Sequence, residues 1–510
     1  MSRISVTSVA WALPFALVSQ AALADLTPTE VWGDWRAYLE SAGYTVEAGE
    51  AVAGNALTVS NIRLGMPMPA DEGVANLSLG TLTFQQNADG SVSVVMPAVQ
   101  QLRMHMTAAE PDAKPVQLDL SFTQNGHALT ARGSIENITY DYAAESLAMV
   151  LDQLQVGDET YGEQNAKFKL AATGVKNATT VTVDQVRSYQ QTGTIASVEY
   201  DIFVDNPEDS TKLKLAGGLS GLTLDGGGAI PLEIIDAEDM AAMIKAGFKV
   251  SGQIAYAQGR SDAELTDPEN GSFKAATTSG GGTLDMKMGA EGLAYSGAQK
   301  DLAVAVNVAE MPFPIEFSMA EGGFNLAVPV SKSETPQGFA LGLTLAQFKM
   351  SDLIWSIFDP AGQLPRDPAT LKVDLAGKAT MLTDILDPEA AAKLGDTPPG
   401  KLETLRVNTL LLDAVGAKLS GSGDVTFDNT DTTTFDGMPK PEGALDLSLA
   451  GGNALLDKLV AMGLIPADQA MGARMMMGLF TVPGDAPDTL KSKIEFTPDG
   501  QVLANGQRIK

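Results

Sequence analysis

The sequence predicts a mainly β protein with a few short helices (α+β), built as a long, twisted antiparallel β-sheet or groove of loosely repeated, strand-rich units. Hydrophobic residues make up 44% of the chain, yet beyond the N-terminus no apolar run is long enough for a membrane span of about 18 residues. Instead, short segments with alternating apolar and polar residues recur, separated by Gly, Asn, Asp and Pro. A helix near the N-terminus is expected to cap one end of the sheet.

Residues 1–24 are typical of a cleavable signal peptide. Arg3 is their only charged residue, residues 6–18 are mostly apolar, and residues 22–24 (ALA) have the small residues of a cleavage site. The apolar part is too short to span a bilayer as a helix. We therefore expect export to the periplasm, a mature chain that starts near Asp25, and no transmembrane anchor in the mature chain.

The first element of the mature chain is a helix with clear start and stop signals. Thr27 and Glu30 have the spacing of a capping box, and Pro28 suits the first helical position. Gly43 suits a left-handed residue after the last turn.

Two tryptophans on this helix have two interpretations. Trp32 and Trp35 recur at helical spacing with other apolar residues, which favours packing against a sheet. Alternatively, they form an aromatic lip at the end of an apolar groove. Trp355, in a second short helical segment, is a third candidate for a groove or cap position.

Turn residues divide the rest of the chain. Asp89-Gly90, Asn125-Gly126 and Asp499-Gly500 each predict a hairpin between alternating segments. The glycine runs at 226–228 and 280–282 lack the strand-then-helix context of a nucleotide-binding loop, and we expect simple loops there.

The chain divides into two predicted β-rich regions. The first is residues 25–260 with the capping helix, and the second is residues 283–510. Between them, residues 261–282 are poor in apolar side chains and predict a linker-like loop. In the second region an alternating strand is followed three times by a short amphipathic helix, at 341–360, 371–395 and 443–466. Such loose repetition is typical of stacked units that bury a shared face.

Composition excludes several functions. The chain has 63 acidic and 34 basic residues and a net charge of −29, which argues against nucleic-acid binding. It contains no Cys and only two His residues, so thiol chemistry and a three-histidine metal site are excluded. Met104 and Met106 point away from His105 in a strand, which disfavours a copper site. We expect no catalytic residues, no metal and no cofactor.

Three segments carry a resemblance to a known family. They are residues 27–46 (TPTEVWGDWRAYLESAGYTV), 352–377 (DLIWSIFDPAGQLPRDPATLKVDLAG) and 499–509 (DGQVLANGQRI). With the signal-peptide start, the chain resembles an exported bacterial protein family of unknown function, a DUF-type periplasmic family. More distantly, its strand-plus-helix units are similar to AsmA-like envelope proteins, and that resemblance implies a long β-groove for lipid. The chain departs from AsmA-like proteins because it retains no N-terminal membrane anchor.

These observations lead to a hypothesis with two alternatives. We expect a non-catalytic periplasmic β-groove protein that binds an apolar ligand, such as lipid, in envelope maintenance. One alternative is a scaffold with a filled core that binds other envelope proteins through its sheet edges. The other is a hydrolase of envelope polymers, which requires a converging carboxylate pair. An open apolar trough or a filled core would distinguish the first two.

Overall fold

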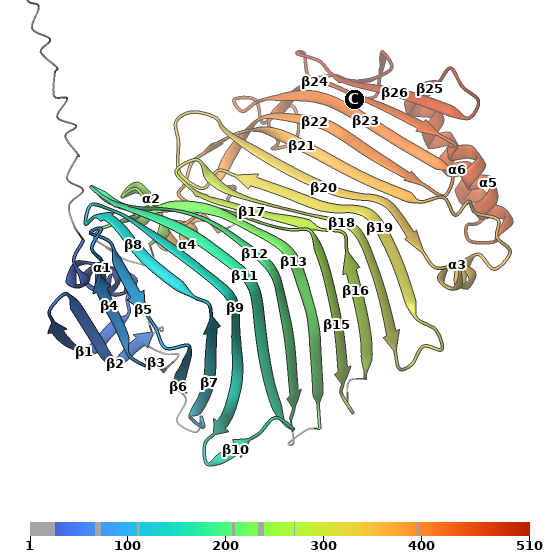
Figure 1. Ribbon diagram of the computed structural model, residues 1–510. Coiled ribbons are helices and arrows are strands. Elements are labelled where there is room, and N and C mark those ends of the chain that lie inside the picture. The colour runs from blue at the N-terminus through green and yellow to red at the C-terminus, as the bar shows by residue number, and fades with distance from the viewer. Residues whose placement is uncertain are drawn as a thin grey trace, which may run out of the picture.

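The computed structural model describes residues 26–66, 73–109, 113–206, 210–232, 239–269, 271–395 and 397–510, so the predicted signal peptide lies outside the described residues. The described chain is mainly β, as predicted. Its strands form one 28-stranded sheet in which neighbouring strands are antiparallel, and six helices accompany the sheet. Figure 1 shows that the sheet is long and twisted, with the N-terminal strands at one end and the C-terminal strands at the other.

The N-terminal part begins with helix α1 (Pro28–Ser41). The predicted capping box is confirmed, because the Glu30 backbone N–H donates to the Thr27 side chain and the Glu30 carboxylate accepts from the Thr27 N–H. Short strands follow, namely β1 (Thr45–Ala53), β2 (Ala56–Met66), β3 (Val74–Leu79), β4 (Leu82–Gln86), β5 (Val92–Val95), β6 (Val99–Thr107), β7 (Val116–Asn125) and β8 (Ala128–Ser134).

The middle of the sheet contains its longest strands, β9, β12 and β13. The elements in this part are β9 (Asn137–Val156), β10 (Glu159–Tyr161), β11 (Ala166–Val183), β12 (Val186–Asp205), β13 (Lys212–Pro231), α2 (Met240–Lys245), β14 (Lys249–Tyr256), β15 (Gln258–Thr266), β16 (Phe273–Ser279), β17 (Gly282–Gly289), β18 (Gly292–Val308), β19 (Ile315–Val328) and β20 (Gln337–Met350).

The C-terminal part alternates strands and helices. Its elements are α3 (Asp352–Phe358), β21 (Ala369–Met381), α4 (Pro388–Leu394), β22 (Gly400–Ala414), β23 (Ala417–Asp428), β24 (Lys440–Ala450), α5 (Gly452–Ala461), α6 (Ala467–Phe480), β25 (Val482–Pro483), β26 (Thr489–Phe496), β27 (Val502–Ala504) and β28 (Gln507–Arg508). Three strands of this part are each followed by a short helix, namely β20 by α3, β21 by α4, and β24 by α5.

The structure differs from the linker-like loop expected at residues 261–282. This segment contains most of β15, all of β16 and the start of β17, and these strands continue the ladder without a break in the sheet. Its small polar residues are tolerated because neighbouring strands on both sides satisfy the backbone. The two β-rich regions are therefore parts of one continuous sheet.

Two of the expected hairpins form, and one does not. The turn at Asp89-Gly90 joins the paired strands β4 and β5, and the turn at Asp499-Gly500 joins β26 and β27. The hairpin expected at Asn125-Gly126 is wrong, because β7 and β8 pair with successive parts of β9 and not with each other. Gly126 has a φ of 57° and bends the chain without reversing it.

Gly126 is the first position of a line of irregular residues that crosses the sheet, which we call the crease. At the crease at least one residue pair is missing from each ladder; for example, β12 and β13 pair through Ile195–Leu222 and Ser197–Ser220 but not between Ala196 and Gly221. The crease positions follow the register of the strands from the end of β7 to β20: Gly126, Glu145, Gly174, Ala196, Gly221, Ala257, Gly281, Asp301, Ala320 and Gln347.

At the crease, the alternation of side chains between the two faces of the sheet shifts by one residue. In β13 the leucines before Gly221 lie at odd positions (Leu213, Leu215), whereas those after it lie at even positions (Leu222, Leu224). Gly221 has a φ of 63°, so it absorbs the shift as a bulge residue does. The strands bend along this line (Figure 1). The shift keeps the apolar side chains of β13 on one face.

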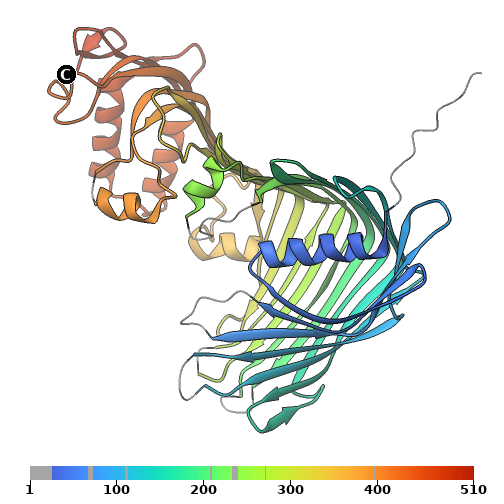
Figure 2. The same ribbon diagram turned by 90° about the vertical axis from the view of Figure 1, so that its left-hand side faces the viewer.

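Helix α1 lies against this apolar face, which we call the inner face (Figure 2). The core of the protein is there: Val31 and Trp32 of α1 pack with Leu57, Phe84 and Ile138 of the sheet. The opposite, outer face carries cross-strand ion pairs, which include Lys167–Asp201, Arg260–Glu199 and Lys274–Glu264. The two faces of the sheet thus differ sharply in polarity.

Candidate functional site

Two rows of directly paired residues cross the inner face from β13 to β26, and directly paired side chains share a face. The first row is Leu224, Ile254, Leu284, Gly297, Phe324, Leu343, Val373, Leu410, Gly421, Leu447 and Ser492. The second row is Gly226, Gly252, Met286, Tyr295, Leu326, Leu341, Leu375, Val407, Gly423, Leu445 and Ile494. None of these residues carries a charge.

The central part of both rows is open to solvent. Eight large apolar side chains from β14, β17, β18, β19 and β20 are between 37% and 50% exposed, and we call them the apolar strip: Ile254, Leu284, Met286, Tyr295, Phe324, Leu326, Leu341 and Leu343. Tyr295 and Phe324 are also in ring contact, with centroids 5.2 Å apart. Soluble monomers rarely expose a contiguous apolar patch of this kind, so the strip is a candidate binding surface.

Sequence position alone explains why the strip is apolar and its reverse side is polar. Side chains alternate between the faces of a strand. The residues that face outwards from the same strands include Asp285, Ser296 and Asn325. An apolar ligand would therefore find one suitable face of the sheet and one unsuitable face.

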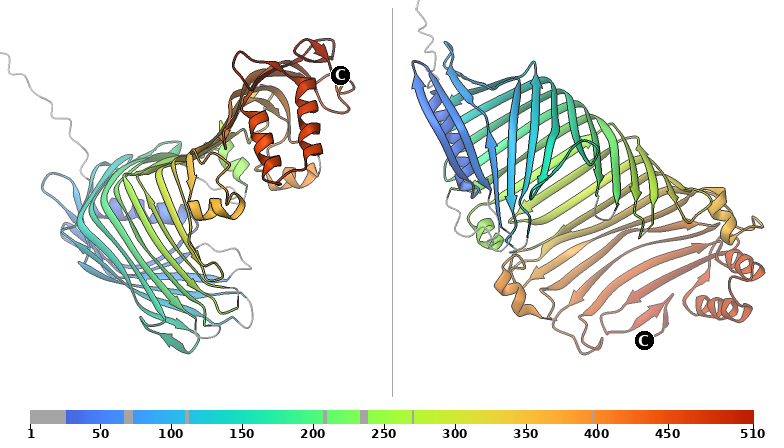
Figure 3. Two further views of the ribbon diagram at one scale, coloured as in Figure 1. Left: turned by 90° about the vertical axis from the view of Figure 1, so that its right-hand side faces the viewer. Right: turned by 90° about the horizontal axis from the view of Figure 1, so that it is seen from below.

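Helices cover the inner face at both ends of the rows and leave the strip between them. At one end, Arg187 of β12 forms an ion pair with Asp34 of α1. Arg187 and Gln191 are four residues apart on β12, so their side chains point to the same face. Gln191 pairs directly with Gly226 of the second row, which places both residues on the inner face. At the other end, Ser492 of β26 donates a hydrogen bond of 2.6 Å to the carbonyl of Phe480, the last residue of α6. Figure 3 shows α5 and α6 against the C-terminal strands.

The structure does not bring the three candidate tryptophans together. Trp32 is 3% exposed, and Trp35 packs edge-on against Phe84 at 5.4 Å between ring centroids. Both belong to the contact that fixes α1 to the sheet. Trp355 is buried on α3, where its ring contacts Phe358 and lies near the Arg366 guanidinium. A role of these tryptophans in ligand contact stays a prediction.

Sequence reasoning missed the residues of the strip. The signal was present, since Leu, Met, Phe and Val recur at every second position of 284–288, 324–328 and 339–345. Alternation says that such residues share a face, but it does not say whether another segment covers them. Only the arrangement of the helices shows that these side chains are exposed.

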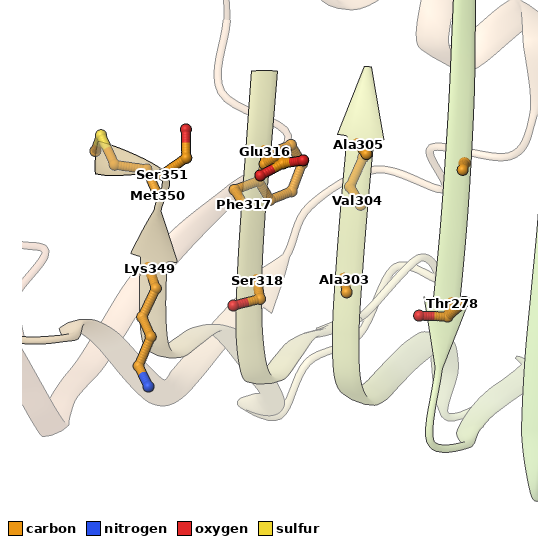
Figure 4. Close-up of a pocket in the computed structure, with 11 residues that line it drawn as sticks. Thr278, Ala303, Val304, Ala305, Glu316, Phe317, Ser318, Lys349, Met350 and Ser351 are labelled. Carbon is orange, nitrogen blue, oxygen red and sulfur yellow. The ribbon is translucent and has the colours of Figure 1, made fainter. Parts of the chain in front are cut away.

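A depression on the outer face has a different character. It has a volume of about 480 Å³ and is lined by Glu316, Ser318, Lys349 and small residues from neighbouring strands (Figure 4). Glu316 and Lys349 are exposed and bring one acid and one base to an open surface. Their arrangement does not provide the converging carboxylate pair that a polymer hydrolase requires.

Within the described residues, no group of three or more His, Asp or Glu side chains is placed to hold a metal ion. No helix in the same part of the chain is both long and apolar enough to cross a membrane.

Comparison with known proteins identifies one matching family. Residues 244–509 match a family described as an uncharacterized protein conserved in bacteria (DUF2125). The matched region runs from α2 to the C-terminus and contains the whole apolar strip. No curated protein matches the chain.

Proposed function

The chain belongs to DUF2125, a family of uncharacterised bacterial proteins, and we propose that it binds the hydrocarbon chain of a lipid-like amphiphile along the apolar strip. The observation that carries this proposal is the apolar strip itself: eight exposed apolar side chains that lie between the two helix-covered ends of the inner face. Removing apolar surface from water is favourable at roughly 25 cal/mol per Å². A ligand without polar groups would gain most from such a surface.

The chemistry of the strip favours a hydrocarbon over a peptide. The strands of the strip satisfy their backbone groups within the sheet, because each has a paired neighbour on both sides. The paired side chains next to the strip, such as Gly297, Val373 and Leu375, offer no hydrogen bond either. A peptide lying there would leave its own N–H and C=O groups unsatisfied, at a cost in free energy. An acyl chain has no such groups.

The length of the strip also suits an acyl chain. Adjacent strands lie about 4.8 Å apart, so the five neighbouring strands of the strip, from β14 to β20, span about 19 Å. One leaflet of a bilayer's hydrocarbon core is roughly 15 Å deep. A single extended chain therefore fits along the strip without reaching the helices at its ends.

We further propose that this binding takes place in the periplasm and serves the cell envelope. The support is the signal-peptide pattern of residues 1–24, together with a chain that has no cysteine and needs no reducing compartment. Fractionation of cells that produce the full-length chain should place a shortened protein in the periplasmic fraction; an unprocessed protein in the cytoplasm would contradict this part.

Lipid analysis of the purified protein tests the binding proposal. Protein purified without detergent should release lipid on organic extraction, detected by mass spectrometry. Phe324→Glu and Leu326→Glu place a charge in the strip and should reduce the bound lipid several-fold. The matched control is Asn325→Glu, since Asn325 is exposed on the outer face between these two residues and should leave lipid binding unchanged.

Two outcomes would overturn the proposal. One is wild-type protein that carries no lipid and does not take up lipid from vesicles. The other is an equal loss of lipid in all three variants, because it would show that lipid binding does not depend on the inner face. A specific protein partner in place of lipid would instead favour a scaffold.

A further inference from the structure

The two apolar rows become polar where they continue across the sheet toward α1. Beyond Leu224 the first row continues through Gly193 of β12 to Asn177 of β11. Beyond Gly226 the second row continues through Gln191 of β12 to Thr179 of β11. The inner face thus passes from apolar side chains to uncharged polar side chains within two strands.

These polar side chains form two neighbouring hydrogen-bonded sets, Gln191 with Asn177 and Thr179, and Tyr142 with Gln124. Together we call them the amide cluster: Gln124, Tyr142, Asn177, Thr179 and Gln191. The Gln191 amide donates to Asn177 Oδ1 at 2.8 Å, and the Asn177 amide donates to Thr179 Oγ1 at 3.0 Å. Tyr142, which pairs directly with Asn177, donates its hydroxyl to Gln124 Oε1 at 3.1 Å across the inside of the crease. Gln191 is exposed, so the cluster is accessible from solvent.

The amide cluster is electrically neutral, and the basic side chains of β11 and β12 nearest to it in the described part of the chain are either paired or on the opposite face. The nearest basic residue on the inner face of β12 is Arg187, about 13 Å from Gln191 along the strand. Arg187 is committed to Asp34 of α1, with 2.6 Å between the charged groups. Lys176 of β11 lies on the opposite face from Asn177 because adjacent residues alternate. The chain as a whole carries a net charge of −29, which repels anions.

This inference rests on the proposed function and extends it. We propose that the amide cluster binds the head group of the amphiphile whose chain lies on the apolar strip, and that this head group has no net charge. Amide and hydroxyl groups can donate to and accept from ester, hydroxyl and phosphate oxygens. An anionic head group would require a charge-assisted partner, usually Arg or Lys, which the cluster lacks.

The geometry gives the bound molecule a direction. Gly193 and Phe324 lie on the same row and are separated by five strand spacings, or about 24 Å. A head group at Gln191 and Asn177 therefore places an extended chain over Leu224, Ile254 and Leu284. The chain end falls near Tyr295 and Phe324.

Site-specific quenching tests this direction, and the absence of cysteine in the chain makes single-site labelling clean. A fluorophore is attached at Gln191→Cys in one variant and at Phe324→Cys in another, with phosphatidylcholine carrying a nitroxide on the choline or near the chain end. We expect the choline nitroxide to quench the label at 191 more strongly, and the chain-end nitroxide to quench the label at 324 more strongly. The reverse pattern, or equal quenching at both sites, would overturn the head-group inference while leaving lipid binding intact.

Head-group selectivity provides the second test. Wild-type protein is incubated with vesicles of equal parts phosphatidylcholine and phosphatidylglycerol with matched chains, and the bound lipid is measured by mass spectrometry. We expect phosphatidylcholine to exceed phosphatidylglycerol about fivefold to tenfold, as one or two hydrogen bonds would produce. Gln191→Leu should lower this ratio, and Thr192→Leu, on the outer face, should leave both the ratio and the total bound lipid unchanged.

The outcomes separate this inference from the proposed function. A wild-type ratio near one, or a ratio that Gln191→Leu does not change, overturns the assignment of the amide cluster although lipid is bound. A wild-type protein that takes up neither lipid overturns both the proposed function and this inference.

Discussion

Arg187 of β12 and Asp34 of α1 form an ion pair with 2.6 Å between Nη1 and Oδ1, and their side chains are only 13% and 3% exposed. The hydroxyl of Tyr140 donates to the other oxygen of Asp34 at 2.7 Å. Burial, followed by the hydrogen bond to Asp34, raises the pKa of Tyr140, so this hydroxyl stays protonated as a donor. One carboxylate thus fastens the N-terminal helix to two long strands of the inner face.

We predict that Asp34→Ala costs about 3–5 kcal/mol of folding free energy, because it leaves Arg187 buried without its partner. Urea denaturation followed by circular dichroism measures this loss. The matched control is Asp424→Ala, which removes the partner of Arg406 from a pair that is about two-thirds exposed. That exposed pair should contribute less than about 1 kcal/mol. Equal losses in both variants would show that burial does not set the strength of the contact at Asp34.

The second prediction concerns Trp32, whose indole N–H donates to Glu50 Oε1 at 2.7 Å within the α1 contact. Trp32→Ala should cost about 3–5 kcal/mol, because it empties a buried site. Trp32→Phe keeps most of the ring and should cost less, mainly the hydrogen bond at about 1 kcal/mol. Thermal or urea unfolding measures both. Normal stability of Trp32→Ala together with lost lipid binding would instead support the role of Trp32 as a lip residue.

The third prediction tests the crease at Gly174. This residue has a φ of 59°, and a Cβ added there would lie 2.9 Å from the Cβ of Ala196. Gly174→Ala should therefore lose about 1–2 kcal/mol from the left-handed backbone, and more from the close contact. Gly338→Ala in β20 is the control, since an added Cβ meets no atom within 4 Å.

A double variant separates the two causes at Gly174. Ala196→Gly in the Gly174→Ala background removes the contact and leaves the backbone cost. Partial recovery of stability in chemical denaturation is expected. Full recovery would mean that the left-handed conformation carries no cost, contrary to the account of the crease.

The fourth prediction is a dependence on pH at the start of α5. Burial opposes ionisation of Asp488, but hydrogen bonds from the backbone N–H groups of Ala454 and Asn453 outweigh it and hold the pKa of this carboxyl below its usual value. A lowered folded-state pKa contributes stability above the unfolded value of about 3.9. That contribution is lost as the pH falls through the folded-state pKa.

Asp488→Asn should therefore destabilise the protein at neutral pH and flatten the loss of stability below about pH 4. The measurement is the urea midpoint across an acid titration, compared with wild type. If the urea midpoint of Asp488→Asn falls as steeply below about pH 4 as that of the wild-type protein, Asp488 does not contribute to the loss of stability in acid.

Much of the local structure was predictable because its causes lie within a few residues. The capping box of Thr27 and Glu30 and the turn at Asp89-Gly90 are such cases, since each satisfies backbone groups of its own segment. The strands of the segment 261–282 were not predictable, since their stability comes from partners on β13 and β18. The glycines at 226–228 lie inside β13 for a similar reason: a Cβ on Gly228 would meet the ring of Tyr189 on the next strand.

The sequence by itself determined that one face of each strand is apolar and the other polar, because side chains alternate wherever a strand forms. It also determined the place and start of α1 through local hydrogen bonds. Only the tertiary structure decided that the alternation shifts along one line, because Gly221 acts as a crease residue only when Ala196 and Ala257 stand opposite it in register. Likewise, exposure of the strip depends on where α1, α5 and α6 pack, and that placement comes from contacts between residues far apart in the chain.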